Sequence, residues 1–172
     1  MRDKYITRKV KVEGGYLDFS SAHFVTYSGK CERLHGHNYT VVVEVEGELG
    51  DDKIVVDFTV LKRITKAVCR QLDHRFLLPL HNPHLNITSA TDTWKICFNE
   101  KCYIFPRDDV VELPIENTTA EQLAEYIGEE LYRTLAVEDA RALTRLHVLL
   151  VGVAETPMQM AFYRRQLQQN RG

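Results

Sequence analysis

The 172-residue chain is predicted to have an α+β fold, in which an antiparallel sheet is covered by two helices on one face. Three observations predict this class. Segments with the residue pattern of strands come in pairs towards the two ends of the chain. Two segments with helical spacing of apolar residues lie between these pairs. Paired antiparallel strands with helices between them favour a sheet that is covered on one side.

The N-terminal strands are expected over residues 4–13 and 16–25, where the extended pattern has a rough period of two. A loop is expected over residues 26–34. Residues 37–48, HNYTVVVEVEGE, are rich in β-branched side chains and alternate in their later part, so they form the clearest strand of the sequence.

The first helix is expected over residues 59–72, because its apolar side chains fall near helical spacing and Asp57 or Thr59 can cap it. The second is expected to start at Thr118–Glu121, whose sequence fits a capping box. Its core positions are predicted to be Leu123, Ile127 and Leu131.

Between the helices, residues 75–92 are expected to be irregular, and residues 94–98 with 102–105 to form a small hairpin. After the second helix, residues 144–154 are predicted to be a long buried strand and residues 158–164 the last strand. The four-stranded sheet is then complete.

Charge and hydropathy exclude two classes of partner. The formal net charge is −2, whereas nucleic-acid binding favours a strongly basic face. No apolar run approaches the ~20 residues of a membrane span, and the N-terminus lacks the apolar core of a signal peptide. We therefore expect a cytoplasmic protein without nucleic-acid or membrane partners, whose four cysteines are reduced.

The stretch Cys31-Glu-Arg-Leu-His35-Gly-His37 is the most informative. If the chain is extended there, His35 and His37 leave the same face of a strand. His23, in the preceding extended segment, is the expected third member of the cluster. Three histidines leave one position of a tetrahedral zinc site open, as a catalytic zinc needs. The competing interpretation is a pair of surface histidines in a turn.

Three other residues have both a functional and a plain interpretation. Cys31 is an acid/base group, a fourth ligand that closes a structural metal site, or a small buried hydrophobe. Asp73 can orient His74 for proton transfer, or the pair merely ends the first helix. Glu155 can offer two acceptors to a guanidine-like N–C–N edge, or it is a turn residue.

Taken together, these motifs resemble the 6-pyruvoyl-tetrahydropterin synthase family, and most of all the bacterial 6-carboxy-tetrahydropterin synthases of queuosine biosynthesis. The resemblance runs from about residue 5 to 165, and its motifs are weak singly and specific together. The matching segments are Phe19–Phe24, Cys31–Tyr39, Val56–Phe58, Leu61–Lys62, Leu72–His74, Thr118–Ala124 and Glu155–Thr156.

The resemblance implies a tunnelling fold, in which three four-stranded sheets close into a barrel and two trimers stack as a homohexamer. It implies bound Zn²⁺ and a pterin substrate, with Cys31 and the Asp73–His74 pair contributed by neighbouring subunits. The implied site residues are the zinc ligands His23, His35 and His37, the proton-transfer groups Cys31, Asp73 and His74, and the pterin-binding residues Glu155, Thr118, Thr119 and Glu121.

The implied substrate is 7,8-dihydroneopterin triphosphate. Three residues separate Cys31 from His35, as is usual in the carboxy-forming group, whereas the pyruvoyl-forming enzymes usually have five. We therefore expect 6-carboxy-5,6,7,8-tetrahydropterin as the product, with loss of triphosphate and acetaldehyde. The alternatives are a 6-pyruvoyl or other pterin product and a non-catalytic, zinc-stabilised binding module.

The sequence departs from the family at about residues 79–117, where a short loop is usual. We interpret residues 1–172 as a single tunnelling-fold domain that carries this insertion. The insertion could be a lid, an inter-subunit arm or decoration. Cys97 and Cys102 could face each other across its hairpin, and we do not expect them to form a metal site.

Overall fold

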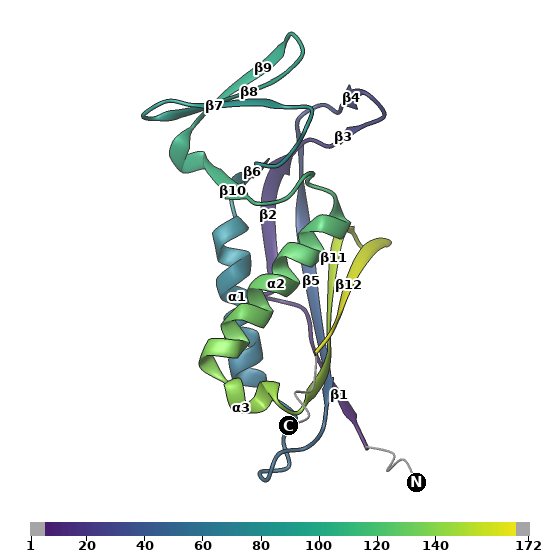
Figure 1. Cartoon of the computed structure of the whole chain (residues 1–172). Coiled ribbons are helices and arrows are strands. Elements are labelled where there is room, and N and C mark those ends of the chain that lie inside the picture. The colour runs from purple at the N-terminus through teal and green to yellow at the C-terminus, as the bar shows by residue number, and fades with distance from the viewer. Residues whose placement is uncertain (1–5, 168–172) are drawn as a thin grey trace.

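A mixed sheet of seven strands forms the body of the protein (Figure 1). The computed structural model describes residues 6–167. The strands of this sheet are β1 Arg8–Val12, β2 Asp18–His23, β5 His35–Gly47, β6 Arg75–Pro79, β10 Val110–Leu113, β11 Leu146–Thr156 and β12 Gln159–Gln166. Their order is β10–β6–β2–β5–β11–β12, and β1 pairs with the end of β5 that β2 leaves free.

The sheet is larger than the four antiparallel strands that were predicted. The expected antiparallel part is present, because β5 pairs antiparallel with β1, β2 and β11, and β11 pairs with β12. Beyond β2, however, β6 and β10 add two parallel pairings. Residues 75–79 were expected to be irregular, but Phe76–Leu78 is a short apolar run that becomes extended when it is buried beside β2.

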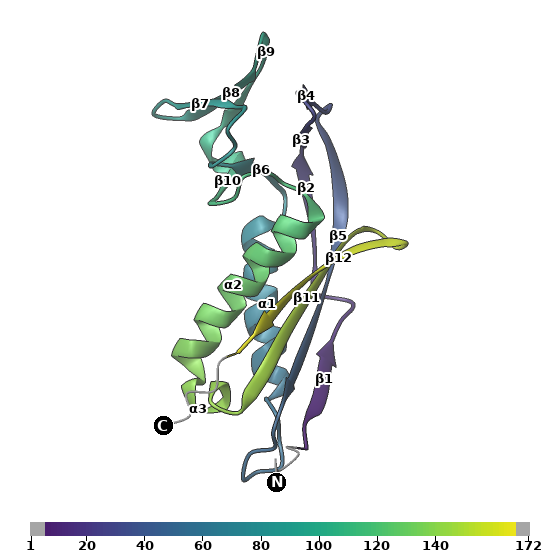
Figure 2. The same ribbon diagram turned by 45° about the vertical axis from the view of Figure 1, so that its right-hand side comes forward.

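The two long helices, α1 Phe58–Leu72 and α2 Ala120–Glu138, cover one face of this sheet, as predicted (Figures 1 and 2). Asp57 caps α1, since its carboxylate accepts a hydrogen bond from the Thr59 amide at 2.7 Å. A short helix, α3 Ala140–Leu143, follows α2. Within residues 6–167, every helix lacks the combination of length and apolar composition that crossing a membrane requires.

The cap of α2 lies one residue later than the predicted capping box. Thr119 is the N-cap and accepts from the Gln122 amide, and the Gln122 side chain accepts from the Asn117 amide at 2.7 Å. Gln122 therefore bonds to Thr119 through its amide and to Asn117 through its side chain, in place of the predicted pairing of Thr118 with Glu121. This shift leaves the Thr118 side chain pointing inward, where it is fully buried.

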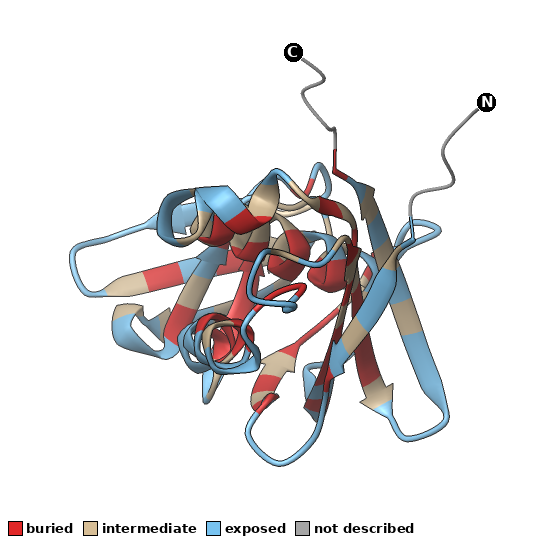
Figure 3. Ribbon diagram, turned by 90° about the horizontal axis from the view of Figure 1, so that it is seen from below, coloured by how far each residue is buried: buried red, intermediate tan, exposed pale blue. Residues whose placement is uncertain are grey.

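The main core fills the space between the helices and the sheet, and Figure 3 shows its buried residues between these layers. Every second side chain of β5 from Tyr39 to Val45 points into it, as strand geometry requires. The predicted core positions of α2 are confirmed. Its fully buried members include Leu123, Ile127, Leu131, Leu61, Leu72, Val43, Leu149 and Val151.

Two small elements lie beyond one end of the sheet (Figure 1). The hairpin of β3 Thr26–Tyr27 and β4 Lys30–Cys31 falls within the predicted loop. The second element is a three-stranded sheet of β7 Asn86–Ser89, β8 Thr93–Phe98 and β9 Lys101–Pro106, in which β8 and β9 form the predicted hairpin. A one-turn 3-10 helix, Arg107–Asp109, leads from it to β10.

Two of the four cysteines are bonded, contrary to the expectation that all would be reduced. The register of β8 and β9 sets Cys97 directly opposite Cys102, and the two form a disulfide. The inference that they face each other across the hairpin is confirmed. Cys31 and Cys69 are free thiols, and Cys69 is buried in the main core.

Candidate metal centre

Three histidines converge at the end of the helix-covered face of the sheet. In the antiparallel pairing of β2 with β5, His23 stands opposite His35, and His37 lies one pair further along the same face. The potential ligand atoms of the three side chains all lie within 4.8 Å of one another. The predicted cluster is therefore formed within a single chain and does not include Cys31, so a closed site with Cys31 as a fourth ligand has no support in this arrangement.

Backbone carbonyls set the orientation of two of these rings. His23 Nδ1 lies 2.9 Å from the Thr118 carbonyl oxygen, and His35 Nδ1 lies 2.8 Å from that of Arg33. A carbonyl can only accept, so each Nδ1 carries the proton and each Nε2 keeps its lone pair. Within the described residues, His23 Nε2 is buried without a hydrogen-bond partner. A buried, unpartnered nitrogen beside two other imidazoles fits a metal ligand.

The protonation state of His23 suits metal binding. Burial lowers the pKa of His23 to about 4, although the hydrogen bond to Thr118 opposes this and the neighbouring His35 and His37 add to it. The ring is therefore neutral at pH 7. A histidine must be neutral to bind a metal, so the fold itself prepares this ligand.

The stability of the metal-free protein is expected to depend on the titration of His23. Between pH 6.5 and about pH 4 the unfolded chain binds a proton at this ring and the folded chain does not. As the pH is lowered through this window, the free energy of unfolding should therefore decrease, by roughly 3 kcal/mol in total. Above pH 6.5 this contribution should be constant. Urea titrations of wild type and His23→Gln would isolate it, and equal pH slopes for the two proteins would contradict the assignment.

Gly36, between two of the ligands, is required by a close approach of β2. A Cβ atom at this position would lie 2.9 Å from the carbonyl oxygen of Ser21. Glycine is therefore the residue that lets β5 pair tightly with β2 at the point where His23 faces His35.

The histidines open onto a cavity of about 660 Å³ at the N-terminal end of α2. It brings together six of the residues predicted for the site, since Thr119, Glu121 and Glu155 line it with the three histidines. Tyr39 lies beneath them, and its ring contacts those of His23 and His37. The negative charge of Glu155 adds to the effect of burial in raising the pKa of Tyr39, so this hydroxyl stays protonated.

Glu32 also lines this cavity, and the sequence prediction missed it. The sequence prediction named the neighbouring Cys31 instead. The Cys31 side chain is half-buried, and its Sγ lies 3.5 Å from the Glu32 carbonyl oxygen. Burial raises the pKa of Cys31, while the charge of Lys101 lowers it. The signal that could have identified Glu32 is a carboxylate three residues before a histidine ligand.

Thr118 has a supporting place rather than a position on the cavity wall. Its carbonyl orients His23, and its hydroxyl donates to the Phe24 carbonyl at 3.0 Å. Because the residue is fully buried, its side chain is not available to a ligand in the cavity. The expectation that Thr118 binds substrate stays a prediction, to which its side chain would not contribute.

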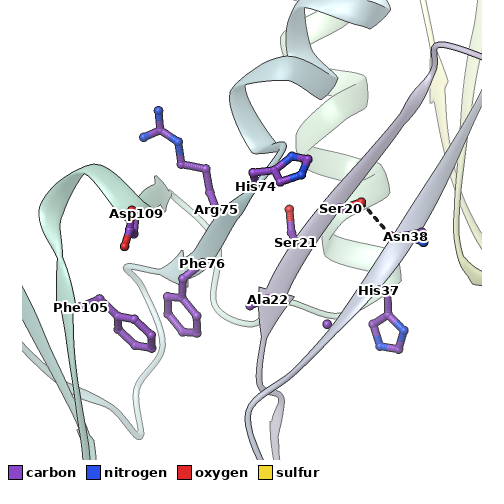
Figure 4. A pocket seen from close by; sticks show the side chains of 11 residues that line it. Ser20, Ser21, Ala22, His37, Asn38, His74, Arg75, Phe76, Phe105 and Asp109 are labelled. Carbon is purple, nitrogen blue, oxygen red and sulfur yellow. Dashed lines mark hydrogen bonds between the residues drawn. The ribbon is translucent and has the colours of Figure 1, made fainter.

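His74, which follows Asp73, lines a different cavity of about 640 Å³, which Figure 4 shows, and the ligand His37 lines this cavity as well. His74 lines it beside Ala22, Gly36 and Asn38, which alternate with the histidine ligands along β2 and β5. This cavity therefore opens on the side of the sheet away from the helices. Asp73 and His74 belong neither to the histidine cluster nor to the lining of the metal cavity.

The dyad is nonetheless well ordered. His74 Nδ1 lies 2.9 Å from Asp73 Oδ2, and Asp73 Oδ1 accepts from the Ser20 amide at 2.8 Å. The bond from Ser20 and the contact with His74 lower the pKa of Asp73. His74 has a φ of 57° and a largely exposed ring. A carboxylate that fixes Nδ1 and leaves Nε2 open to solvent is an arrangement suited to proton transfer to a ligand held by another surface.

Replacement of a single histidine is expected to lower the metal content of the protein. His37→Ala removes one of three ligands, and a site with two imidazoles binds zinc much more weakly. Metal analysis after exposure to equimolar Zn²⁺ should therefore give a low content for His37→Ala and about one ion per chain for wild type. His84→Ala, which alters an exposed histidine outside the cluster, is the control. Full occupancy in His37→Ala would overturn the site.

The fold and these side chains define an α+β protein with three histidines placed to hold a metal ion and a cavity beside them. Comparison with known proteins then gives its family. The profile of the family "6-pyruvoyl tetrahydropterin synthase" matches residues 16–166, so the chain belongs to this family.

Two relatives are named for a carboxylated product. A Methanocaldococcus jannaschii protein, provisionally named 6-carboxy-5,6,7,8-tetrahydropterin synthase, is 37% identical over 153 residues, which cover 88% of this chain and 92% of that protein. The 6-carboxy-5,6,7,8-tetrahydropterin synthase of Haemophilus influenzae is 34% identical over 121 residues, covering 67% of this chain and 77% of that protein.

A solved structure resembles the chain over nearly its whole length. The 6-pyruvoyl tetrahydropterin synthase of Plasmodium vivax superposes with a TM-score of 0.87 at 35% identity, and covers 94% of this chain and 99% of that one. A coverage of 94% leaves fewer residues unmatched than the 79–117 insertion contains. Most of the insertion therefore has a counterpart in that protein.

Proposed function

We propose that the protein is a zinc-dependent 6-carboxy-tetrahydropterin synthase, a cytoplasmic lyase of queuosine biosynthesis. Its substrate is 7,8-dihydroneopterin triphosphate, which loses triphosphate and acetaldehyde. The observation that carries this proposal is the cavity shared by the three histidines and Glu155. The names of the relatives and the spacing of Cys31 from His35 support the carboxylated product over the alternatives.

The residues at the cavity have different roles in the proposed reaction. His23, His35 and His37 would hold the zinc ion, which supplies Lewis-acid polarisation of the substrate's side-chain hydroxyls. Glu155 faces the same space and accepts two hydrogen bonds from the amino group and ring N–H of a pterin. Cys31, at the end of β4, exchanges a proton with the side chain of the substrate.

Glu155→Gln is expected to weaken substrate binding. The amide keeps one acceptor and presents a donor where the pterin also donates, so a charge-assisted pair is lost. We expect a loss of about 1.5–3 kcal/mol in binding free energy, which is a rise in KM of roughly 10- to 150-fold, with the metal content unchanged. Steady-state kinetics on Glu155→Gln and on the neighbouring Gln159→Glu test this. An unchanged KM would make Glu155 a turn residue.

Assembly would complete the site. Asp73 and His74 do not line the metal cavity of their own chain, so we propose that a neighbouring subunit brings its Asp73–His74 pair to it. The outer strand β12 offers an unpaired edge with the exposed apolar side chains Met160 and Phe162, which a second sheet would cover. A homohexamer built as a dimer of trimers satisfies both requirements, and light scattering that gave a monomer would oppose it.

A second product is favoured by one observation. Two further structures of the P. vivax pyruvoyl synthase are of variants in which a catalytic glutamate is replaced by alanine or by cysteine. Glu32 is a glutamate on the cavity wall of this chain, one residue beyond Cys31. With Glu32 as the proton-transfer group, 6-pyruvoyl-tetrahydropterin becomes the candidate product.

Mass spectrometry of the product decides between these functions. Purified protein loaded with Zn²⁺ is incubated with 7,8-dihydroneopterin triphosphate, and the pterin, triphosphate and aldehyde are measured. The carboxylated pterin with acetaldehyde supports the first proposal. A pyruvoyl product supports the second, and unaltered substrate leaves a binding module.

A further inference from the structure

The 79–117 insertion is attached to the β3–β4 hairpin at its two ends. Near its start, Asn82 is buried and its side chain donates to Thr26 Oγ1 at 2.8 Å. At its end, the Asn117 side chain accepts from the Thr26 amide at 3.2 Å and donates to the Thr26 carbonyl at 2.7 Å. Thr26 begins β3, so the first residue of the hairpin is fixed by three hydrogen-bonding atoms of the insertion.

The tip of the insertion holds the other end of the hairpin. Lys101, the first residue of β9, donates from Nζ to the Glu32 carbonyl oxygen at 2.9 Å. The ammonium also lies 5.2 Å from the centre of the Tyr103 ring. The same Glu32 carbonyl accepts the weaker contact from Cys31 Sγ. Lys101 therefore contacts the short segment that carries both Cys31 and Glu32.

Apolar packing joins the same parts. Tyr103 of β9 stacks on Phe24, the residue after the ligand His23, with ring centres 5.5 Å apart. Apart from the main core, the described residues form a smaller hydrophobic cluster that includes the buried Trp94 and Ile96 of the insertion. Cys31 packs against this cluster. A rotation of the insertion would disturb Cys31 and the chain beside His23 together.

We propose that Lys101 is a positioning residue, which through the Glu32 carbonyl fixes the segment bearing Cys31 and Glu32 at the edge of the metal cavity. The insertion then serves to fix the position of this segment. It is neither a lid over the cavity nor a segment without a role. The proposal rests on the proposed function only in taking Cys31 or Glu32 as a group that acts on the substrate.

The charge of Lys101 has a second effect. Burial raises the pKa of Cys31 and the Glu32 carboxylate raises it too, whereas the Lys101 ammonium lowers it. Lys101 is therefore the cation that opposes two groups favouring the neutral thiol. Removing it should leave Cys31 harder to ionise as well as less firmly placed.

Lys101→Met keeps the aliphatic part of the side chain and removes the donor and the charge. We expect kcat to fall roughly 10- to 100-fold, because a misplaced group costs rate even when binding is intact. KM should stay within about threefold of wild type, since the residues that hold the pterin are untouched. Lys101→Arg should recover much of the rate, and Lys95→Met, at an exposed position of β8, should behave as wild type.

A second measurement does not depend on the substrate. The rate of alkylation of Cys31 by iodoacetamide is followed against pH, with Cys31→Ser as the blank, because Cys69 is buried. We expect the midpoint to move upward in Lys101→Met and to stay in place in Lys101→Arg and Lys95→Met, with an unaltered metal content in all. A wild-type midpoint together with wild-type kcat in Lys101→Met would overturn the proposal. A shifted midpoint in a protein that does not turn over dihydroneopterin triphosphate would refute the proposed function and uphold the role of Lys101.

Discussion

Cys31→Ser is expected to retain its metal and to lose turnover by roughly 10²–10⁴-fold, which is the usual contribution of a positioned acid or base. The metal should stay because Cys31 is not a member of the histidine cluster. Serine is nearly isosteric with cysteine, but its hydroxyl ionises far less readily, so the fold survives and the proton transfer does not. Metal analysis and single-turnover rates on the same preparation measure both effects.

Glu32→Gln is the matched control for this experiment. If Cys31 moves the proton, Glu32→Gln should lower turnover much less than Cys31→Ser does. The reverse ranking would assign the chemistry to Glu32 and favour the pyruvoyl product. Loss of metal from Cys31→Ser would instead make Cys31 a ligand, contrary to the geometry.

Two inactive proteins are expected to restore activity when their subunits are mixed. Cys31→Ser lacks the proton-transfer group that we propose for the metal cavity, and His74→Ala lacks a group that lines the other cavity. We suppose that each site takes Cys31 from one subunit and His74 from its neighbour. Random assembly of equal amounts of the two variants then gives about one quarter of the sites both intact residues. Co-expression followed by an activity assay should recover that fraction.

The control is a mixture in which both changes lie in the same subunit. Cys31→Ser/His74→Ala chains mixed with wild type should also give mixed oligomers, whereas the double variant alone should stay inactive. Failure of the two single variants to complement each other, in oligomers shown to be mixed, would mean that His74 serves its own chain or none.

The sequence supports the metal centre better than the rest of the site. Residues two apart on a strand share a face, so His35 and His37 could be paired from spacing alone. His23 could be added to the cluster on the single assumption that its strand pairs with theirs. The cap of α2 could not be placed as well, because Thr118 and Thr119 are both good caps and only packing decides between them.

The remaining errors come from tertiary contacts. The run Phe76–Leu78 is too short to reveal its period, and it becomes a strand only because β2 lies beside it. Likewise, the sequence separates Lys101 from Glu32 by the whole first helix and most of the insertion. Their contact depends on how the β8–β9 hairpin folds back over β4.

The disulfide between Cys97 and Cys102 has a practical consequence for handling the protein. Reductants are commonly added to keep a free thiol such as Cys31 from oxidation, but the same reagents open a disulfide on a hairpin tip. Dithiols also compete for zinc through their sulfur atoms. Preparations made with and without reductant are thus chemically different samples, and their activities should be compared before a variant is judged. Anaerobic purification in a buffer without thiols or other reductants keeps Cys31 reduced, the Cys97–Cys102 disulfide intact and any bound zinc in place.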